Sequence, residues 1–448
     1  MNNLKNHQLL NPRWLGAYIL LLALFLRLGY VLTLEIDVPI RADAAKYVTI
    51  AHNLLTNGVY SHYPKDNPEP SSLITPGYPL FLSSILYLTG DINVTYQIAL
   101  FLQAILSAIT VLLAYHIALR FLPLWFSVTA GVLAAISPHL IVAAGYLLSE
   151  TLFAFFLVIS TYVLLLAIET PSKARFLVYG LLMGCTALVR PAALLLPIFT
   201  LLPVIFLKDF KMNPRISIII AAAGFLTLWM PWQVWAPLHA PKATNAEKVF
   251  AFGTYPDFTY KNPELRGYPY REDTEYKKMA ADFGYALSTL VDRAAEDPVK
   301  YFSWYFVGKP TSYWGWSMIQ GMGGPFIYPV KKTLYDKSSV AKFTYLSMKL
   351  LHYVLISVLF IGLFSAAIYI IATRNLFIFG VPALVTFLII VYTTLLHTVF
   401  APLPRYSVPF YPFMYTSALF FIYYFARHQR VTHIFNRSQG VAKPNSHN

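Results

Sequence analysis

Long apolar runs separated by short basic turns dominate this chain. We predict a membrane-spanning helix from each run, because about 20 apolar residues in helical form cross the hydrocarbon core of a bilayer. The ten predicted spans are 14–34, 95–118, 124–143, 147–168, 175–190, 192–207, 216–237, 347–372, 376–396 and 406–426. Two stretches, 35–94 and 238–346, interrupt this pattern and are too long to be simple turns. The pattern indicates an all-α polytopic membrane protein with two large loops.

The short turns predict the orientation of these spans. Basic residues gather in the turns on one side and in the C-terminal tail, namely Arg120, Lys173, Arg175, Lys208, Lys211, Arg215, Arg374, Arg427, Arg430, Arg437 and Lys443. The positive-inside rule makes this the cytoplasmic side and places both long loops on the outer face. We expect three parts: spans one to seven with the first loop in 1–237, an outer subdomain in 238–346, and the last three spans with the basic tail in 347–448.

The first outer loop contains a predicted amphipathic helix that stops at Gly58. Its apolar residues recur at helical spacing, at Ala44, Tyr47, Val48, Ala51, Leu54 and Leu55. Such a helix lies along the membrane surface. The second loop is rich in Tyr, Pro and Trp, and we expect it to form a small mixed subdomain with one helix over 272–296.

Composition narrows the class of protein and its partners. Hydrophobic residues make up 57% of the 448 positions and charged residues 12%, whereas a soluble domain is about a quarter charged. The net charge of +14 has no basic arm or aromatic-basic alternation around it, so we expect no nucleic-acid partner. The single cysteine, Cys185, excludes an intrachain disulfide.

Asp43 is the leading candidate for chemistry, because it is a carboxylate just outside the first span, at the start of the surface helix. Beside a membrane it suits a general base that deprotonates an acceptor hydroxyl. The alternative is that Asp43 caps the helix beginning at Ala44, as Asp often does.

Three further charged residues are expected at the outer ends of spans. Arg405 and Arg190 carry planar guanidinium groups that suit a phosphate. Alternatively, Arg405 extends to the membrane surface or pairs with an acid of a loop, and Arg190 belongs to a positively charged turn. Glu150 could bind substrate, a metal ion or Arg190, and it is equally consistent with an acid at a helix N-terminus, which the helix dipole favours. Arg27 lies near the end of the first span, and we expect it to snorkel to the surface.

The chain resembles the membrane glycosyltransferases of the C-type fold, which take sugars from polyprenyl phosphates. It is most similar to bacterial relatives of protein O-mannosyltransferase and lipid A aminoarabinose transferase. The pieces that carry this resemblance are Asp43 with Tyr47 and Ala51, Asn53-Leu54-Leu55 with Gly58, Pro76-Gly77-Tyr78-Pro79, Ser137-Pro138, Ser149-Glu150-Thr151, Leu188-Val189-Arg190-Pro191, Pro231-Trp232, and Arg405-Tyr406 with Pro409.

The resemblance implies that Asp43 is the catalytic base and that Arg405 and Arg190 hold the lipid phosphate. It adds Glu150, Tyr47 and Tyr406 as substrate-binding residues. It further implies an inverting displacement from a polyprenyl-phosphate sugar to a lipid, glycan or protein hydroxyl, on the periplasmic face of a bacterial inner membrane. Protein mannosyltransferases usually carry an Asp-Glu pair where this chain has Asp43-Ala44, which favours the broader bacterial group. A divalent metal ion stays an open alternative, with no ligands placed for it.

Two other functions remain as alternatives. A transporter or flippase for a lipid-linked sugar would have symmetric halves and polar residues at the midplane, whereas here they gather at one face. A polysaccharide polymerase or ligase would have its main polar cluster in a late loop, whereas Asp43 lies in the first.

Overall fold

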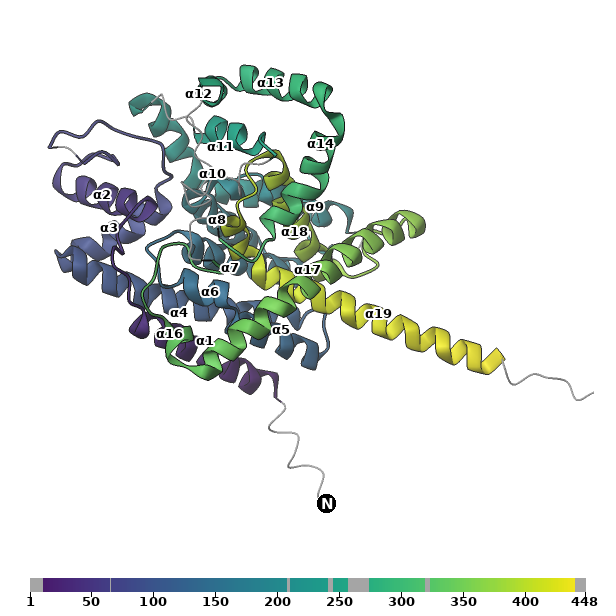
Figure 1. The fold of residues 1–448 in the computed structure, drawn as a ribbon. Coiled ribbons are helices and arrows are strands. Elements are labelled where there is room, and N and C mark those ends of the chain that lie inside the picture. The colour runs from purple at the N-terminus through teal and green to yellow at the C-terminus, as the bar shows by residue number, and fades with distance from the viewer. Residues whose placement is uncertain are drawn as a thin grey trace, which may run out of the picture.

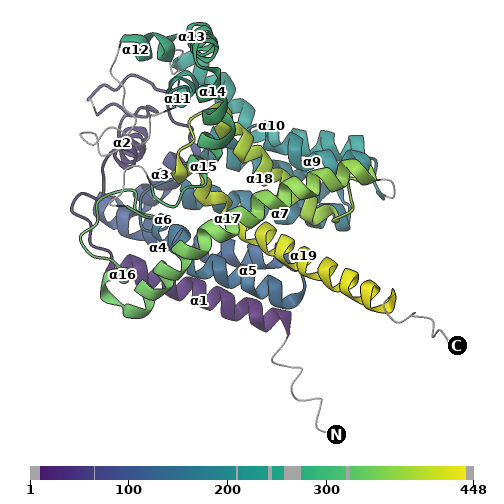
Figure 2. The same cartoon turned by 45° about the vertical axis from the view of Figure 1, so that its right-hand side comes forward.

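Helices occupy every predicted span in the computed structural model of the protein, which describes residues 11–64, 66–207, 210–240, 245–256, 274–318 and 323–439 (Figures 1 and 2). The helices of the spans are α1 (Pro12–Thr33), α4 (Ile92–Ala118), α5 (Leu124–Ile136), α6 (Pro138–Ala143), α7 (Glu150–Glu169), α8 (Lys173–Val189), η1 (Pro191–Ala193), α9 (Leu196–Phe206), α10 (Pro214–His239), α17 (Ser339–Thr373), α18 (Val381–Val399) and α19 (Tyr411–Gln439). Among the described residues, α1, α4, α7, α10, α17 and α18 are long and apolar enough to cross a membrane. The chain is therefore an all-α membrane protein, as predicted.

Two spans are built differently from the prediction. The span predicted at 124–143 is broken into α5 and α6 at Ser137-Pro138, because proline cannot donate the helical hydrogen bond and keeps the preceding residue extended. The last span begins at Tyr411 and follows a short 3-10 helix, η4 (Pro404–Phe410). Arg405 therefore lies on a separate segment in front of α19.

The first outer loop contains the predicted surface helix, α2 (Asp43–Thr56), followed by α3 (Gly77–Thr89). The described parts of the second loop form α11 (Asn245–Gly253), α12 (Thr274–Ala281), α13 (Phe283–Glu296), α14 (Pro298–Ser303), η3 (Trp304–Gly308), α15 (Lys309–Tyr313) and α16 (Leu334–Lys337). The single helix predicted at 272–296 is thus two helices, and residues 272–273 lie outside the described part. A mixed subdomain is not confirmed, because the described residues show helices and one isolated antiparallel bridge between Glu35 and Lys332.

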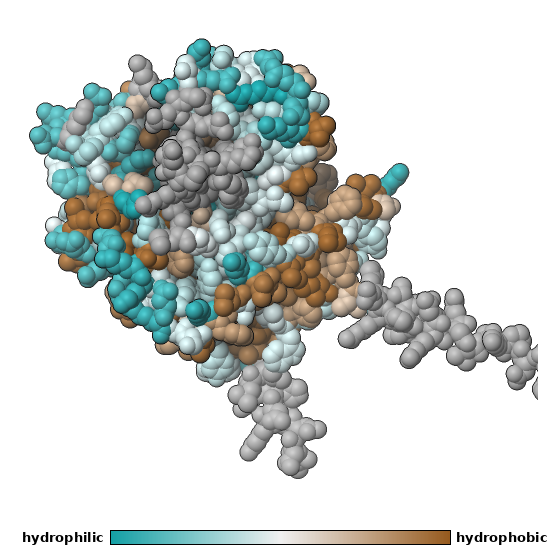
Figure 3. All heavy atoms as spheres, viewed as in Figure 1, coloured by the Kyte–Doolittle hydropathy of each residue, from teal (hydrophilic) through white to brown (hydrophobic). Residues whose placement is uncertain are grey.

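The two ends of the molecule carry different parts of the chain. The start of α1 and the end of α19 lie at one end of the bundle, and α2, α11, α12 and α13 lie at the other (Figure 2). Large apolar side chains are exposed along α1 and α17, and Figure 3 shows a hydrophobic stripe over α17. Such surfaces on helices of this length fit contact with lipid tails.

Glycine allows α8 and α10 to approach each other closely. A β-carbon on Gly180 would overlap the carbonyl oxygen of Ala221, and one on Gly224 would lie 2.5 Å from the carbonyl oxygen of Leu177. Small residues let helix backbones approach closely where lipid offers no hydrophobic drive for association. This contact holds α8, which ends directly before Arg190, against the long helix α10.

The prediction for Arg27 is wrong. Its side chain is fully buried rather than turned to the surface. Nε donates to Ser107 Oγ at 2.6 Å, and the terminal nitrogens donate to the carbonyl oxygens of Ala23, Ala135 and Ala134. The carbonyls of Ala134 and Ala135 are available because the helix stops at Ser137-Pro138, so Arg27 fastens α1 to the break between α5 and α6.

Candidate active site

Four charged side chains from distant parts of the sequence meet at the outer end of the bundle. Asp43 is the first residue of α2, Glu150 the first of α7, Arg190 follows the last residue of α8, and Arg405 lies in η4. Each is at or next to the end of a helix. We call these four residues the acid-arginine cluster.

Arg405 joins the two carboxylates. Its Nη2 lies 2.9 Å from Asp43 Oδ2, and its Nε donates to Glu150 Oε1 at 2.5 Å. The planar guanidinium group makes this possible, because its donors point in fixed and different directions. Arg405 therefore holds the first loop and α7 at a set separation.

Arg190 binds the same carboxylate from the other side. Its Nη2 lies 2.7 Å from Glu150 Oε1, and its Nε donates to Ser149 Oγ at 2.8 Å. Both arginines thus share one oxygen of Glu150. The second oxygen, Oε2, is buried and has no hydrogen-bond partner among the described residues.

Exposure distinguishes the two carboxylates. The Asp43 side chain is 36% exposed, whereas that of Glu150 is 0% exposed. Only Asp43 is open to a molecule that approaches from water. Glu150 instead fixes the positions of the two guanidinium groups from the buried side of the cluster. Its buried charge in turn needs both of them as partners.

Asp43 does not cap α2, so this alternative is wrong. The residue at the N-cap position is Ala42, and no side chain makes a capping hydrogen bond there. Ala42 has φ 48° and ψ −118°, a backbone conformation that residues with a β-carbon rarely adopt. Strain of this kind is found at functional sites, where surrounding contacts hold it in place. Here it turns the chain so that the Asp43 carboxylate faces Arg405.

The charges of the cluster keep Asp43 ionised. Burial by itself would raise the pKa of the Asp43 carboxyl, but Arg405 and then Lys46 outweigh burial and hold the pKa below its usual value. Lys46 lies one turn further along α2, with Nζ 3.8 Å from Asp43 Oδ1. Likewise, burial would lower the pKa of Arg405, yet Glu150 and Asp43 raise it well above its usual value. The free site is therefore an ion-paired cluster at neutral pH.

The two predicted tyrosines line the cluster. Tyr47 is buried, and its hydroxyl oxygen lies 3.5 Å from Ser149 Oγ. Burial, followed by the charge of Asp43, raises the pKa of Tyr47 to about 12, so its hydroxyl keeps its proton. The Arg190 guanidinium carbon lies 5.4 Å from the centre of the Tyr406 ring, in cation-π range. All six predicted site residues are thus neighbours, while their roles stay predictions.

The Pro76-Gly77-Tyr78-Pro79 motif packs against the segments that carry Arg190 and Glu150. A β-carbon on Gly77 would lie 2.6 Å from the backbone nitrogen of Val189, directly before Arg190. The Tyr78 hydroxyl donates to Gln103 Oε1 at 2.7 Å, and Gln103 Nε2 donates to the carbonyl oxygens of Ala144 and Tyr146 in the turn before Glu150. The motif therefore positions both Arg190 and Glu150.

We expect Gly77→Ala to lower activity about tenfold or more, because a displacement of about 1 Å at a reacting group can cost a hundredfold. The added β-carbon must push α3 away from the chain before Arg190. Gly29→Ala is the matched control, since a β-carbon there meets no atom within 4 Å. The measurement is the turnover of each variant at equal amounts of folded protein. Equal turnover of the two variants would show that Gly77 has no positioning role.

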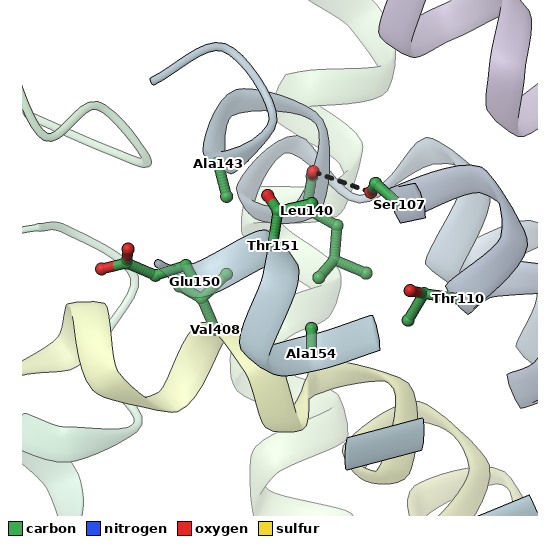
Figure 4. A pocket seen from close by; sticks show the side chains of 8 residues that line it. All are labelled: Ser107, Thr110, Leu140, Ala143, Glu150, Thr151, Ala154 and Val408. Atoms are coloured by element: carbon green, nitrogen blue, oxygen red, sulfur yellow. Dashed lines mark hydrogen bonds between the residues drawn. The ribbon is translucent and has the colours of Figure 1, made fainter. Parts of the chain in front are cut away.

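A small cavity lies next to the cluster, and Glu150 is the one cluster residue among the residues that line it. Figure 4 shows its lining, which is largely apolar and includes the hydrogen bond from Ser107 Oγ to the Leu140 carbonyl oxygen. In this view the Glu150 carboxylate points away from the other lining side chains. The ionised groups therefore act outside this cavity.

The residues present do not fit a divalent metal ion. Within the described parts of the chain, no three His, Cys, Asp or Glu side chains gather into a metal-binding group. Asp43 and Glu150 face guanidinium groups, which compete with a cation for their oxygens.

Sequence reasoning missed three residues beside the cluster. Lys46 pairs with Asp43, and the i, i+3 spacing of the two residues on a helix was the signal for this pair. Ser149 binds Arg190, and its position directly before Glu150 was the signal for this contact. Tyr328 comes from the second outer loop, and its electrostatic neighbours are Arg405, Asp43 and Glu150. No motif around Tyr328 indicates this position.

Part of the sequence matches a known family. Residues 69–235 match the model of the family described as dolichyl-phosphate-mannose-protein mannosyltransferase. This segment includes Glu150 and Arg190, while Asp43 and Arg405 lie outside it. No curated protein matches the chain significantly.

Solved structures show a similar fold at low sequence identity. The oligosaccharyltransferase AglB from Archaeoglobus fulgidus, in complex with an inhibitory peptide and a dolichol-phosphate, has a TM-score of 0.54 and 13% identity, over 98% of this chain and 52% of AglB. The same enzyme tethered with an acceptor peptide gives a TM-score of 0.51 and 14% identity, over 98% and 53% of the two chains. ArnT from Cupriavidus metallidurans bound to undecaprenyl phosphate has a TM-score of 0.39 and 13% identity, over 91% of this chain and 76% of ArnT.

The chain spans about half the length of the AglB chain it matches. The TM-scores above 0.5 show the shared fold, and the family match supplies a sequence relationship over 69–235. The chain therefore shares the fold of the AglB oligosaccharyltransferase, and its residues 69–235 are similar to the protein O-mannosyltransferase family.

Proposed function

We propose that this protein transfers a sugar from a polyprenyl-phosphate donor to an acceptor hydroxyl at the outer face of a bacterial inner membrane. The observation that carries the proposal is the convergence of one accessible carboxylate, Asp43, with two arginines at the membrane surface. A base for the acceptor and cations for a departing phosphate are the groups that such a transfer needs. The family match, described by dolichyl-phosphate-mannose, and the shared fold of AglB in complex with a dolichol-phosphate support a lipid-phosphate donor.

The reaction is a direct displacement with inversion. The acceptor oxygen forms a bond to the anomeric carbon while the bond from that carbon to the phosphate oxygen breaks. Asp43 takes the proton of the acceptor hydroxyl, and the polyprenyl phosphate leaves with the bonding electron pair. Arg405 and Arg190 stabilise the charge on the phosphate. The lipid anchors the leaving group beside the cluster, which lowers the entropic cost of alignment.

Substrate binding would also activate Asp43. In the free protein Arg405 pairs with Asp43, and this pairing makes the carboxylate a weak base. When Arg405 turns to the donor phosphate, Asp43 loses part of its counter-charge and becomes more basic. The base is then strongest when the donor is in place.

This exchange predicts a difference between two pH profiles. In the free protein the pKa of Asp43 is lowered. The value of kcat/KM should therefore stay constant down to a pH below the usual pKa of a carboxyl group, and fall at lower pH as Asp43 takes up a proton. The acid limb of kcat, which reports the substrate complex, should lie at higher pH. Both profiles are measured with saturating and limiting donor. An acid limb of kcat at lower pH than that of kcat/KM would contradict the exchange of Arg405.

The function is tested with membranes from the host, which supply the natural acceptor. Membranes with and without the protein receive radiolabelled sugars on a panel of polyprenyl phosphates. Label that leaves the lipid and joins an acceptor only when the protein is present supports a glycosyltransferase. Label that crosses the bilayer while still attached to its lipid identifies a flippase instead, and overturns the proposal.

A further inference from the structure

We propose that a hollow lined in part by Arg374, at the end of the bundle opposite the acid-arginine cluster, binds an anionic phospholipid. The phosphate of this lipid contacts Arg374, and an acyl chain lies against the apolar wall of the hollow. The site is independent of the proposed transfer reaction, which takes place at the other end of the bundle. We call it the Arg374 hollow.

The Arg374 hollow lies where α7 and α9 end and where α17 turns into α18. Its volume is about 840 Å³, within the range of about 300–1,000 Å³ in which proteins bind small ligands. Most of the described residues that line it are large and apolar, namely Ile168, Phe206, Leu207, Phe210, Leu376 and Phe377. Such a wall suits a hydrocarbon chain better than a soluble metabolite.

The position of the hollow along the bundle brings it to the level of lipid headgroups. Figure 2 shows α9 and the end of α17 at the right of the bundle, while α2 lies at its left. This end also carries the basic turns, such as those with Lys173 and Lys211, and the positive-inside rule predicts that it faces the cytoplasm. A hollow at the ends of spanning helices meets the headgroups at its rim and the acyl chains along its wall.

Arg374 gives the hollow a positive charge that no described acid balances. Its side chain is exposed, and the acid nearest in sequence to the lining residue Ile168, Glu169, pairs with Arg120 instead. Lys208 and Asp209, which stand between two lining residues in the sequence, lie outside the described residues, and their opposite charges cancel. A guanidinium group binds a phosphate through two parallel hydrogen bonds. The charge and the apolar wall together favour an anion that carries a hydrocarbon chain.

The backbone at Arg374 is strained in a way that indicates a function. Arg374 is the C-cap residue of α17, with φ 52° and ψ 29°, in the left-handed region that Gly or Asn usually occupies at this position. Conformations of this kind gather where a side chain has a task. The side-chain oxygen of the next residue, Asn375, accepts a hydrogen bond from Phe377 N at 3.0 Å. This bond leaves the amide nitrogen of Asn375 as a second donor for the phosphate.

The charge of this end of the bundle selects the type of phospholipid. Basic pockets between membrane helices on the cytoplasmic side bind anionic headgroups. A choline headgroup carries its own cation, which Arg374 and the basic turns repel. A glycerol headgroup is neutral and leaves the charge of the phosphate uncompensated. Phosphatidylglycerol is therefore the probe that fits the hollow, and phosphatidylcholine is the matched lipid that does not.

The test uses phosphatidylglycerol and phosphatidylcholine that carry the same photoreactive diazirine in one acyl chain. Each lipid is added to the full-length protein in nanodiscs, the sample is irradiated, and the labelled peptides are quantified by mass spectrometry. Arg374→Asn removes the charge with a residue that tolerates the left-handed backbone, whereas Arg374→Lys keeps the charge. Arg13→Asn is the matched control, because Arg13 is an exposed arginine at the start of α1. Thermal unfolding of each variant checks that the fold is intact.

We expect phosphatidylglycerol to label the peptides with Phe206 and Phe377 about fivefold more than phosphatidylcholine does, as one basic residue beside an anionic lipid implies. Arg374→Asn should reduce this labelling to the level of phosphatidylcholine. Arg374→Lys should keep most of the preference, and Arg13→Asn should keep all of it.

Three results would overturn the inference. Equal labelling of the wild type by the two lipids would leave only an ordinary boundary lipid. A loss in Arg374→Lys as large as that in Arg374→Asn would attribute the effect to the fold of the turn. Peptides cross-linked to a second copy of the chain, with no lipid label, would make the hollow a contact between proteins. None of these results touches the proposed transfer reaction at the other end of the bundle.

Discussion

Asp43→Asn is expected to abolish measurable sugar transfer while donor binding persists. A positioned general base contributes about 10²–10⁴-fold to a rate, and asparagine has nearly the shape of aspartate but cannot take up a proton. The asparagine oxygen can still accept the hydrogen bond that Arg405 Nη2 donates at 2.9 Å, so the cluster keeps its geometry. The measurement is the transfer rate at saturating donor, beside an independent measurement of donor binding.

Asp37→Asn is the matched control for this variant. Asp37 lies in the same loop, and its exposed carboxylate pairs with Lys331 away from the cluster. A surface pair of this kind contributes little, so Asp37→Asn should transfer sugar at the wild-type rate. Undiminished transfer in Asp43→Asn would reject Asp43 as the base. Loss of donor binding together with transfer would instead make it a binding residue.

Arg405→Ala is expected to lose both transfer and stability. The change removes the cation beside the departing phosphate, which costs about 10²–10³-fold in mutagenesis of comparable charge-stabilising groups. It also removes the hydrogen bond to the buried Glu150 carboxylate, and hydrogen bonds to charged groups are worth about 1.5–3 kcal/mol. The loss stays below that of a fully unpaired buried charge, because Arg190 still binds Glu150 at 2.7 Å.

A second substitution separates the two effects of Arg405→Ala. Adding Glu150→Gln neutralises the buried carboxylate, so the double variant should regain thermal stability in detergent but not transfer activity. Arg215→Ala, which removes an exposed arginine at the start of α10, should change neither property. If the double variant recovered activity as well as stability, Arg405 would be a structural partner of Glu150 and not a phosphate ligand.

The contact of Arg405 with two acids bears on the cost of binding the donor phosphate. Arg405 contacts both Asp43 and Glu150, and Arg190 supplies the second positive charge that balances the two carboxylates, so a donor phosphate can take the place of Asp43 beside Arg405. Binding then exchanges one anion for another around Arg405, which limits the desolvation cost of bringing a phosphate to the site.

The chain pattern by itself determined the long apolar helices of the spans and the amphipathic helix α2, and it predicts the side of the outer loops. These features follow from local properties, because the length of an apolar run, the charge of a turn and the spacing of apolar residues act within a few residues. It also placed Asp43, Glu150, Arg190 and Arg405 on one face, since each lies where a span meets the outer side.

Only the tertiary structure decided how these residues pair. Asp43 and Arg405 are 362 positions apart in the sequence, and no periodicity predicts that one guanidinium group reaches both Asp43 and Glu150. The burial of Arg27 depends on carbonyl groups freed where α5 ends, on another helix. The Glu35–Lys332 bridge joins the second loop to the first across about 300 positions of the sequence. Local patterns determine helices and their sides, whereas partners across helices depend on how the helices pack.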